Sequence, residues 1–282
     1  MIDGARTSYV DEGSGPVVLL LHGAPVTSLG FVRVIRELRT THRVIAPDLP
    51  GFGGSEMPRG FGATLDEYAS FVVQFCSALG LRNVVMYVND SSGCIGIAAA
   101  THFAPGTLRG MVVASTVPIP LTGAAWFVGL VLKYIVGSRA MRWLNRRFNL
   151  LPWLVASVAP WLKPFTKAER AALVREFDTI EKRDRVLDFL EQMAVDKVFM
   201  QATAKRASEQ LAHLPAMILY GKFDPMRIIG GVSRFRALFP RNHVVIIPME
   251  EHFPILSSGA KVGSAMRDWM DRLPEDTHDT SG

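Results

Sequence analysis

Short, uninterrupted apolar runs recur in the first part of the chain and again near its end. The first is PVVLLLHG at residues 16–23, a run of β-branched residues and leucines that ends in glycine. Five similar runs follow: RVIAP at 43–47, NVVMYV at 83–88, RGMVVAST at 109–116, AMILYG at 216–221 and HVVIIP at 243–248. Runs of this length and composition are typical of strands that are covered on both faces of a parallel sheet.

Segments with helical periodicity lie between these predicted strands. TLDEYASFVVQFCSALGL, at residues 64–81, opens with Thr64 and Glu67 at capping-box spacing, and its apolar residues recur at helical intervals. GCIGIAAATHF at 93–103 and SAMRDWMDRL at 264–273 predict two more helices. This alternation of strands and helices predicts an α/β domain with a mostly parallel central sheet covered by helices.

The strand pattern disappears between residues 118 and 214. This segment contains short apolar stretches interrupted by Gly and Pro, then two amphipathic stretches at 166–177 and 183–195, and it holds four of the five Trp residues. We expect a helical lid, inserted over the carboxyl ends of the strands, where open α/β sheets bind ligands. A helical domain that only stabilises the sheet is the alternative. The apolar character of the segment predicts an apolar ligand cavity or contact with a membrane surface.

These patterns divide the chain into a core, a lid and a tail. We assign residues 1–117 and 215–275 to the core, 118–214 to the lid, and 276–282 to a disordered tail because PEDTHDTSG is polar and lacks periodicity. The chain has 282 residues, 49% of them hydrophobic, which is enough for one large domain with an insertion.

Charge and cysteine content exclude several classes of protein. The net charge of +5 comes with no nucleic-acid motif, so we expect a solvated basic surface and no nucleic-acid partner. Cys76 and Cys94 provide no disulfide framework, and the N-terminus lacks a signal-peptide pattern, so we expect a cytoplasmic protein. We expect no membrane-spanning helix, because no run of eighteen uncharged apolar residues occurs. The histidines are scattered, and no metal site is expected.

Residues with catalytic potential follow three of the predicted strands. Asp90 and Ser91 follow the strand at 83–88, Asp224 follows the strand at 216–221, and His252 follows the last strand. A candidate nucleophile, an acid and a histidine thus occur in that chain order, each just after a strand. This is the order of the catalytic triad in the α/β-hydrolase fold.

Four motifs occur in the order expected for that fold: LLHGAP at 20–25, APDLPGFGGS at 46–55, LYGKFDP at 219–225 and EHFP at 251–254. Together they resemble the landmarks of the α/β-hydrolase superfamily, nearest the branch of haloalkane dehalogenases and epoxide hydrolases. The resemblance covers nearly the whole chain and implies a lidded hydrolase that uses no cofactor. One departure is that the family normally has another strand before DGARTSYVDEG.

The stretch VNDSSG, at residues 88–93, contains two candidate nucleophiles. Asp90 at the apex resembles the V-x-D-W-G-G elbow of haloalkane dehalogenases and epoxide hydrolases, with Ser92 and Gly93 as the small residues needed where helix and strand approach closely. Ser91 at the apex would instead form a G-x-S-x-G elbow in which Asn89, a residue that tolerates the left-handed region, replaces the first Gly. We favour Asp90. A buried Asp90 that only caps the following helix is a third alternative.

The two nucleophiles imply different chemistry. A carboxylate at Asp90 would attack an sp³ carbon, displace a halide or open an epoxide, and become an alkyl ester. His252, oriented by Asp224, would then activate water to hydrolyse that ester, with the backbone N–H groups of Ala24 and Ser91 as the oxyanion hole. With Ser91 as the nucleophile, the same histidine would serve an esterase or lactonase.

The resemblance leaves the substrate open. Haloalkane dehalogenases usually hold the halide with a Trp after the nucleophile and an Asn or second Trp elsewhere, but those places carry Ser91 and Ala24 here. Epoxide hydrolases usually polarise the epoxide with two lid tyrosines, but this lid has only Tyr134. A non-catalytic ligand-binding protein on the same fold is therefore an alternative of another class. For an enzyme we expect a small to medium hydrophobic substrate, bound by Trp126, Tyr134, Trp153 and Phe253.

Overall fold

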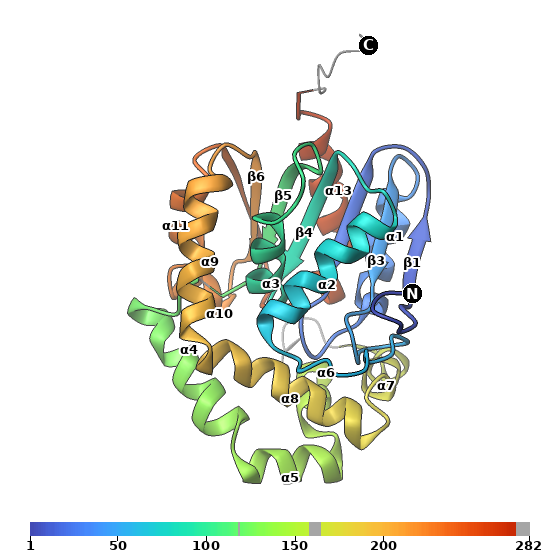
Figure 1. Cartoon of the computed structure of the whole chain (residues 1–282), viewed down its shortest axis with the longest axis vertical. Helices are drawn as coiled ribbons and strands as arrows, with labels where there is room; N and C mark the ends of the chain where they lie inside the picture. The colour runs from blue at the N-terminus through green and yellow to red at the C-terminus, as the bar shows by residue number, and fades with distance from the viewer. Residues whose placement is uncertain (118, 158–164, 275–282) are drawn as a thin grey trace.

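One seven-stranded sheet forms the centre of the molecule (Figure 1). The computed structural model describes residues 1–117, 119–157 and 165–274. The strands lie in the order β1-β3-β2-β4-β5-β6-β7. All neighbours are parallel except β1, which runs antiparallel to β3 at one edge. The bounds are β1 (Tyr9–Glu12), β2 (Val17–Leu21), β3 (Arg43–Pro47), β4 (Val84–Asn89), β5 (Leu108–Ala114), β6 (Ala216–Gly221) and β7 (Asn242–Ile247).

The six apolar runs all form strands, which confirms the predicted mostly parallel sheet. Every residue of β4 and of β6 is buried, as expected for interior strands covered on both faces. One apolar core lies between the sheet and the helices α1 (Val32–Leu38) and α13 (Gly259–Met270). The other lies on the opposite face, under α2 (Leu65–Ala78), α3 (Ser92–Ala100), α9 (Lys197–Gln210) and α11 (Gly231–Leu238).

The segment between β5 and β6 is helical, and most of it gathers at one end of the sheet (Figure 1). In α8 (Ile180–Val195), Phe189 packs edge-on against Phe52 and Tyr68, which joins this segment to the core. The last helix, α9, returns to pack on α3 beside the sheet. The helices that precede α9 are η2 (Gly123–Ala125), α4 (Trp126–Val131), η3 (Leu132–Val136), α5 (Arg139–Phe148), α6 (Leu150–Ser157), α7 (Lys167–Arg175) and α8 (Ile180–Val195).

Three short elements complete the described structure: η1 (Ser28–Phe31), α10 (Pro225–Ile228) and α12 (Pro254–Ser257). The predicted tail at 276–282 lies outside the described residues. No single described helix combines the length and apolarity needed to cross a bilayer. Only the two segments Gly123–Val136 and Arg139–Phe148 reach that length and composition, and they do so together, across a bend of 67°.

Candidate active site

Asp90 lies at the tip of a sharp turn between β4 and α3. Its φ of +48° is in the left-handed region, which carries the chain abruptly from strand to helix. The turn is packed tightly against β5, because a Cβ at Gly93 would overlap the Oγ1 of Thr116. That hydroxyl donates a hydrogen bond of 2.5 Å to the backbone oxygen of Asp90. The geometry therefore requires a residue without a side chain at Gly93.

The loops that follow β4, β6 and β7 carry Asp90, Asp224 and His252, in that order, and they bring these three side chains together. His252 Nε2 lies 3.1 Å from Asp90 Oδ1, and His252 Nδ1 lies 3.0 Å from Asp224 Oδ1. The side chains of Asp90 and His252 are 14% and 18% exposed, whereas Asp224 is fully buried. Asp224 Oδ1 also accepts a hydrogen bond from the Met226 backbone N–H at 2.8 Å, which holds the carboxylate in place. The arrangement has one carboxylate accessible to a ligand and one that can only orient the imidazole.

The two carboxylates determine the protonation of His252. Burial by itself lowers the pKa of His252, but the negative charges and hydrogen bonds of Asp224 and Asp90 outweigh it and raise the pKa to about 10. The imidazole is therefore protonated at neutral pH.

Ser91 is fully buried and faces Asp90 rather than the histidine. Its Oγ donates to Asp90 Oδ2 at 3.0 Å and accepts a hydrogen bond of 2.7 Å from the Ala24 backbone N–H. The predicted oxyanion donor Ala24 thus reaches the Asp90 carboxylate through the Ser91 hydroxyl and not directly. The loop approaches closely: a Cβ on Gly23 would lie 2.7 Å from Asp90 Oδ2.

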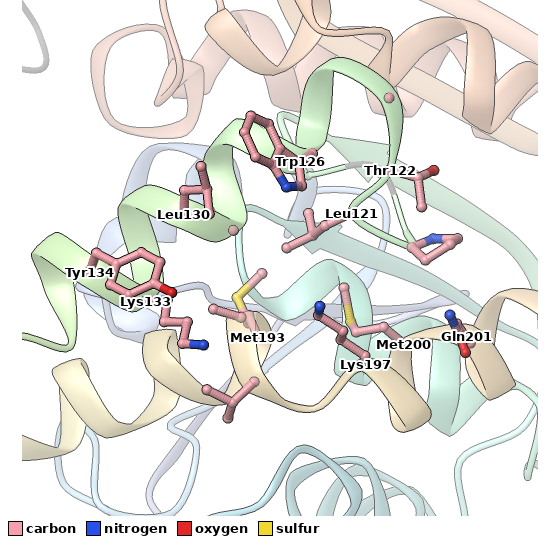
Figure 2. A pocket seen from close by; sticks show the side chains of 15 residues that line it. Leu121, Thr122, Trp126, Leu130, Lys133, Tyr134, Met193, Lys197, Met200 and Gln201 are labelled. Atoms are coloured by element: carbon pink, nitrogen blue, oxygen red, sulfur yellow. The ribbon is translucent and has the colours of Figure 1, made fainter.

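The four predicted substrate-binding residues do not lie together. Phe253 packs edge-on against the His252 ring, with 4.7 Å between ring centroids. Trp126 and Tyr134 instead line a cavity of about 700 Å³ between the α4–η3 helix and the α8–α9 corner (Figure 2). None of the three triad candidates lines that cavity. Trp153 lies on α6, is 48% exposed, and is also absent from the cavity lining.

Two residues that position the site escaped the sequence analysis. Thr116, two residues after the end of β5, holds the turn through its hydroxyl, and its place just after a strand was the available signal. Glu250 is fully buried and accepts hydrogen bonds from the hydroxyls of Ser257 and Ser258, which tie the His252 loop to α12. A glutamate on a polar loop carries no sequence signal of burial.

Both cysteines are free and buried, and Cys94 lies in α3 close behind the turn. Burial raises the pKa of each thiol to about 12. The thiol of Cys94 donates to the backbone oxygen of Ser91 at 3.1 Å. Neither sulfur is a nucleophile near neutral pH, because the thiolate is the reactive form. Within the described residues, no group of three or more His, Cys, Asp or Glu side chains is placed to hold a metal ion.

Two relatives found by sequence cover most of this chain. The chain is 28% identical over 256 residues to haloalkane dehalogenase 2 of Mycobacterium tuberculosis, covering 88% of this chain and 85% of the relative. It is 27% identical over 237 residues to a cis-3-alkyl-4-alkyloxetan-2-one decarboxylase of Shewanella oneidensis, covering 79% of this chain and 71% of the relative.

Solved structures share the fold at lower identity. The epoxide hydrolase CorEH superposes with a TM-score of 0.82 at 20% identity, covering 97% of this chain and 98% of that one. A loop variant of a haloalkane dehalogenase from Bradyrhizobium elkanii superposes with a TM-score of 0.80 at 17% identity, covering 97% and 95%. The family model for the alpha/beta hydrolase fold matches residues 16–258. Since that match spans most of the chain, the protein belongs to the α/β-hydrolase family, with haloalkane dehalogenases and epoxide hydrolases among its relatives and structural neighbours.

Proposed function

We propose that the protein is a cofactor-independent hydrolase in which Asp90 attacks an sp³ carbon of a small to medium hydrophobic substrate. The observation that carries this proposal is the 3.1 Å contact between His252 Nε2 and Asp90 Oδ1, with Asp224 on the other side of the imidazole. The competing nucleophile, Ser91, has its hydroxyl directed to Asp90 Oδ2 and makes no hydrogen bond to His252 within the described residues.

The two oxygens of Asp90 have different roles in this mechanism. Oδ1, which faces His252, attacks the carbon, and the leaving group departs with the bonding electrons. Oδ2, which accepts the Ser91 hydroxyl, becomes the carbonyl oxygen of the alkyl ester. When water attacks that ester, negative charge develops on Oδ2, and the Ser91 hydroxyl is already placed to stabilise it.

Ester formation also prepares His252 for the second step. Before the reaction, the charges of Asp224 and Asp90 keep the imidazole protonated. Alkylation removes the charge of Asp90, so the pKa of His252 falls and the proton can leave through the exposed part of the ring. The neutral imidazole, oriented by Asp224, then takes a proton from the hydrolytic water. The ester breaks at the Asp90 carbonyl, which releases an alcohol and regenerates the carboxylate.

Trapping the intermediate tests this proposal directly. His252→Gln removes the base but leaves the nucleophile, so a substrate should remain attached to the protein and be seen by intact-mass spectrometry. The panel is a haloalkane, an epoxide and an alkylated oxetan-2-one, the classes named by the relatives and structural neighbours, together with an activated ester. A displaced halide is lost from the adduct, whereas a ring-opened substrate adds its full mass. The mass shift therefore also identifies the leaving group.

The position of the adduct distinguishes the alternatives. Trypsin releases the turn in the peptide 83–109, and fragmentation separates Asp90 from Ser91 within it. An alkyl group on Asp90 supports the proposal. An acyl group on Ser91 overturns it in favour of an esterase or lactonase. No adduct from any panel member, together with no turnover by the wild type, favours a non-catalytic ligand-binding protein.

Two further variants serve as controls. Asp90→Asn in the His252→Gln background should abolish the adduct while the protein stays folded. Ser91→Ala should retain the Asp90 adduct but slow its hydrolysis by about 100- to 1,000-fold, because one oxyanion donor is lost. Complete loss of adduct formation in Ser91→Ala would contradict the assigned roles.

A further inference from the structure

The helix formed by α4 and η3 is apolar on both of its sides. On the inner side, Val128 and Leu132 pack against the main core and Val136 is buried. A helix on the surface of a protein normally shows a polar outer side, so one that is apolar all round is expected to be covered. Here the outer side is open, with exposed fractions of 60% for Trp126, 63% for Phe127, 65% for Tyr134 and 53% for Ile135.

The neighbouring helix α5 extends this exposed apolar surface. Trp143 and Phe148 are 62% and 58% exposed, and their rings pack edge to face. Figure 1 shows α4 and α5 toward the lower end of the view. We call the exposed side chains of residues 126–148 the lid face. Clusters of large apolar side chains on a surface mark an interaction site.

Every charged side chain within residues 126–148 is positive, and two of them, Arg142 and Arg146, pair with carboxylates of α8. The sequence contains no Asp or Glu between Asp90 and Glu169, while residues 126–148 include one lysine and four arginines. Lys133, Arg139 and Arg147 are exposed among the apolar side chains. Two of these cations lie over aromatic rings: the Lys133 ammonium is 5.1 Å from the Tyr134 ring centre, and the Arg147 guanidinium is 5.3 Å from that of Phe148.

We propose that the lid face docks on an anionic lipid bilayer. Exposed Trp, Tyr and Phe side chains suit the boundary between head groups and acyl chains, and adjacent Lys and Arg side chains pair with anionic head groups. A second copy of the chain fits this surface less well, because a twofold contact would place like charges opposite one another. A bilayer with anionic lipid supplies both the apolar and the negatively charged partner.

The cavity shown in Figure 2 borders this face. Trp126, Lys133 and Tyr134 belong to both, and Lys197 extends from α9 toward the same space. Apolar side chains such as Leu130 line part of the gap between the α4–η3 helix and the α8–α9 corner. An apolar molecule that leaves a docked bilayer would meet this cavity first.

Vesicle flotation tests the proposal without any measurement of turnover, so its outcome is independent of the proposed function. The full chain should float with vesicles of phosphatidylcholine and phosphatidylglycerol at low salt, and much less with phosphatidylcholine alone or at high salt. Absence of binding to the anionic vesicles would overturn the proposal.

Paired variants locate the binding surface. Phe127→Ser with Ile135→Ser, and separately Lys133→Glu with Arg139→Glu, should each weaken binding to anionic vesicles by about tenfold or more. The matched controls lie away from the lid face: Ile246→Ser on β7, and Lys261→Glu with Arg272→Glu on and just after α13. The charge control makes the same change in net charge, and both controls should bind within about twofold of the wild type.

Two results would contradict docking through the lid face. One is an equal loss of binding in the control variants, which would indicate a general effect of net charge. The other is self-association in sedimentation velocity that Phe127→Ser with Ile135→Ser abolishes, in a protein that does not bind vesicles. That result would identify a second copy of the chain as the occupant.

Discussion

The imidazole of His252 lies between two carboxylates that differ in accessibility. Asp224 is fully buried, so a ligand does not reach its carboxylate. Asp90 is partly exposed, and its charge disappears if it is alkylated. The pKa of His252 is therefore set by the state of Asp90, and this coupling can be measured without a substrate.

Replacing Asp90 imitates the loss of its charge. In Asp90→Asn, the pKa of His252 should fall from about 10 toward the ordinary value of 6.5, because one of the two groups that raise it becomes neutral. Nuclear magnetic resonance of the imidazole protons across a pH titration checks this. Asp178→Asn, at the exposed start of α8, should leave the titration unchanged. An unchanged pKa in Asp90→Asn would mean that Asp90 does not interact with His252 in solution.

The sequence analysis was informative about which residues stand near the site and less so about how they touch. Asp90, Asp224 and His252 were predictable because each follows a strand, and parallel strands end at one edge. The position of the Ser91 hydroxyl was not predictable, because it depends on the left-handed backbone of Asp90 and on a loop far away in the chain. The spacing of motifs in the sequence contains no information on that backbone conformation or on the position of that loop.

At the scale of elements, the junction of α3 with β5 is the tightest contact near the site. Gly93→Ala should destabilise the protein by about 1–3 kcal/mol, because the added carbon would push against Thr116. Gly129→Ala in α4 is the matched control: its Cβ would meet Leu121 at 3.5 Å, an ordinary contact. That variant should be neutral or gain up to about 1 kcal/mol in helix propensity. Urea unfolding of both variants makes the comparison, and equal stabilities would contradict it.

The helices α5 and α8 are joined by a cluster of charges. Arg142 lies 2.8 Å from Asp188, 3.4 Å from Glu191 and 3.7 Å from Asp184, and its side chain is only 26% exposed. Arg142→Met should lower the free energy of unfolding by about 1–2 kcal/mol, and salt should reduce this difference. Lys182→Met breaks the pair that Lys182 of α8 makes with Asp178, just before that helix, and should cost less than about 0.5 kcal/mol. Equal losses from the two variants in thermal or urea unfolding would argue against a cooperative cluster.

Helix prediction succeeded where a cap stood at the start and failed where two helices adjoin. The capping box of Thr64 and Glu67 is present at the start of α2, as its spacing predicted. The pattern did not single out α9, because only Asp196 separates it from α8 and its charged residues are spread around it. Asp196 ends one helix and caps the next, a double role that periodicity does not reveal.

At the scale of the whole molecule, the helical segment touches the core through a partly buried acidic contact. The Thr27 hydroxyl, beside the HGAP loop, donates to Glu176 at 3.3 Å. Burial raises the pKa of Glu176, the Thr27 hydrogen bond opposes this, and the charge of Asp48 adds to it. The ionised carboxylate is thus less favourable in the folded protein than in the unfolded chain.

Glu176→Gln should therefore stabilise the protein at neutral pH, by less than about 1 kcal/mol. Because the folded pKa is raised, the cost of the charge is absent below the ordinary value of 4.5 and appears as the pH rises through the folded pKa. The advantage of Glu176→Gln should vanish in acid. Unfolding curves of wild type and variant across pH check the sign, and an advantage that grows in acid would contradict it.

The global arrangement was the part least accessible to sequence patterns. Apolar runs predicted six of the seven strands and missed β1, whose sequence YVDE is not an apolar run. They also contain no information on the order β1-β3-β2-β4-β5-β6-β7. The same applies to the helical segment between β5 and β6. Its apolar character was clear, yet the pattern did not show that Trp126 and Tyr134 would face a cavity separate from the triad candidates.

The burial of Cys76 and Cys94 has a practical consequence. Electrophilic probes offered to this protein will find no competing native thiol, so adducts can be interpreted without first removing either cysteine. A single cysteine introduced on an exposed helix would be the only thiol to react with a fluorophore or spin label. The unaltered background thus suits site-directed labelling, with which approach to a vesicle can be followed one position at a time.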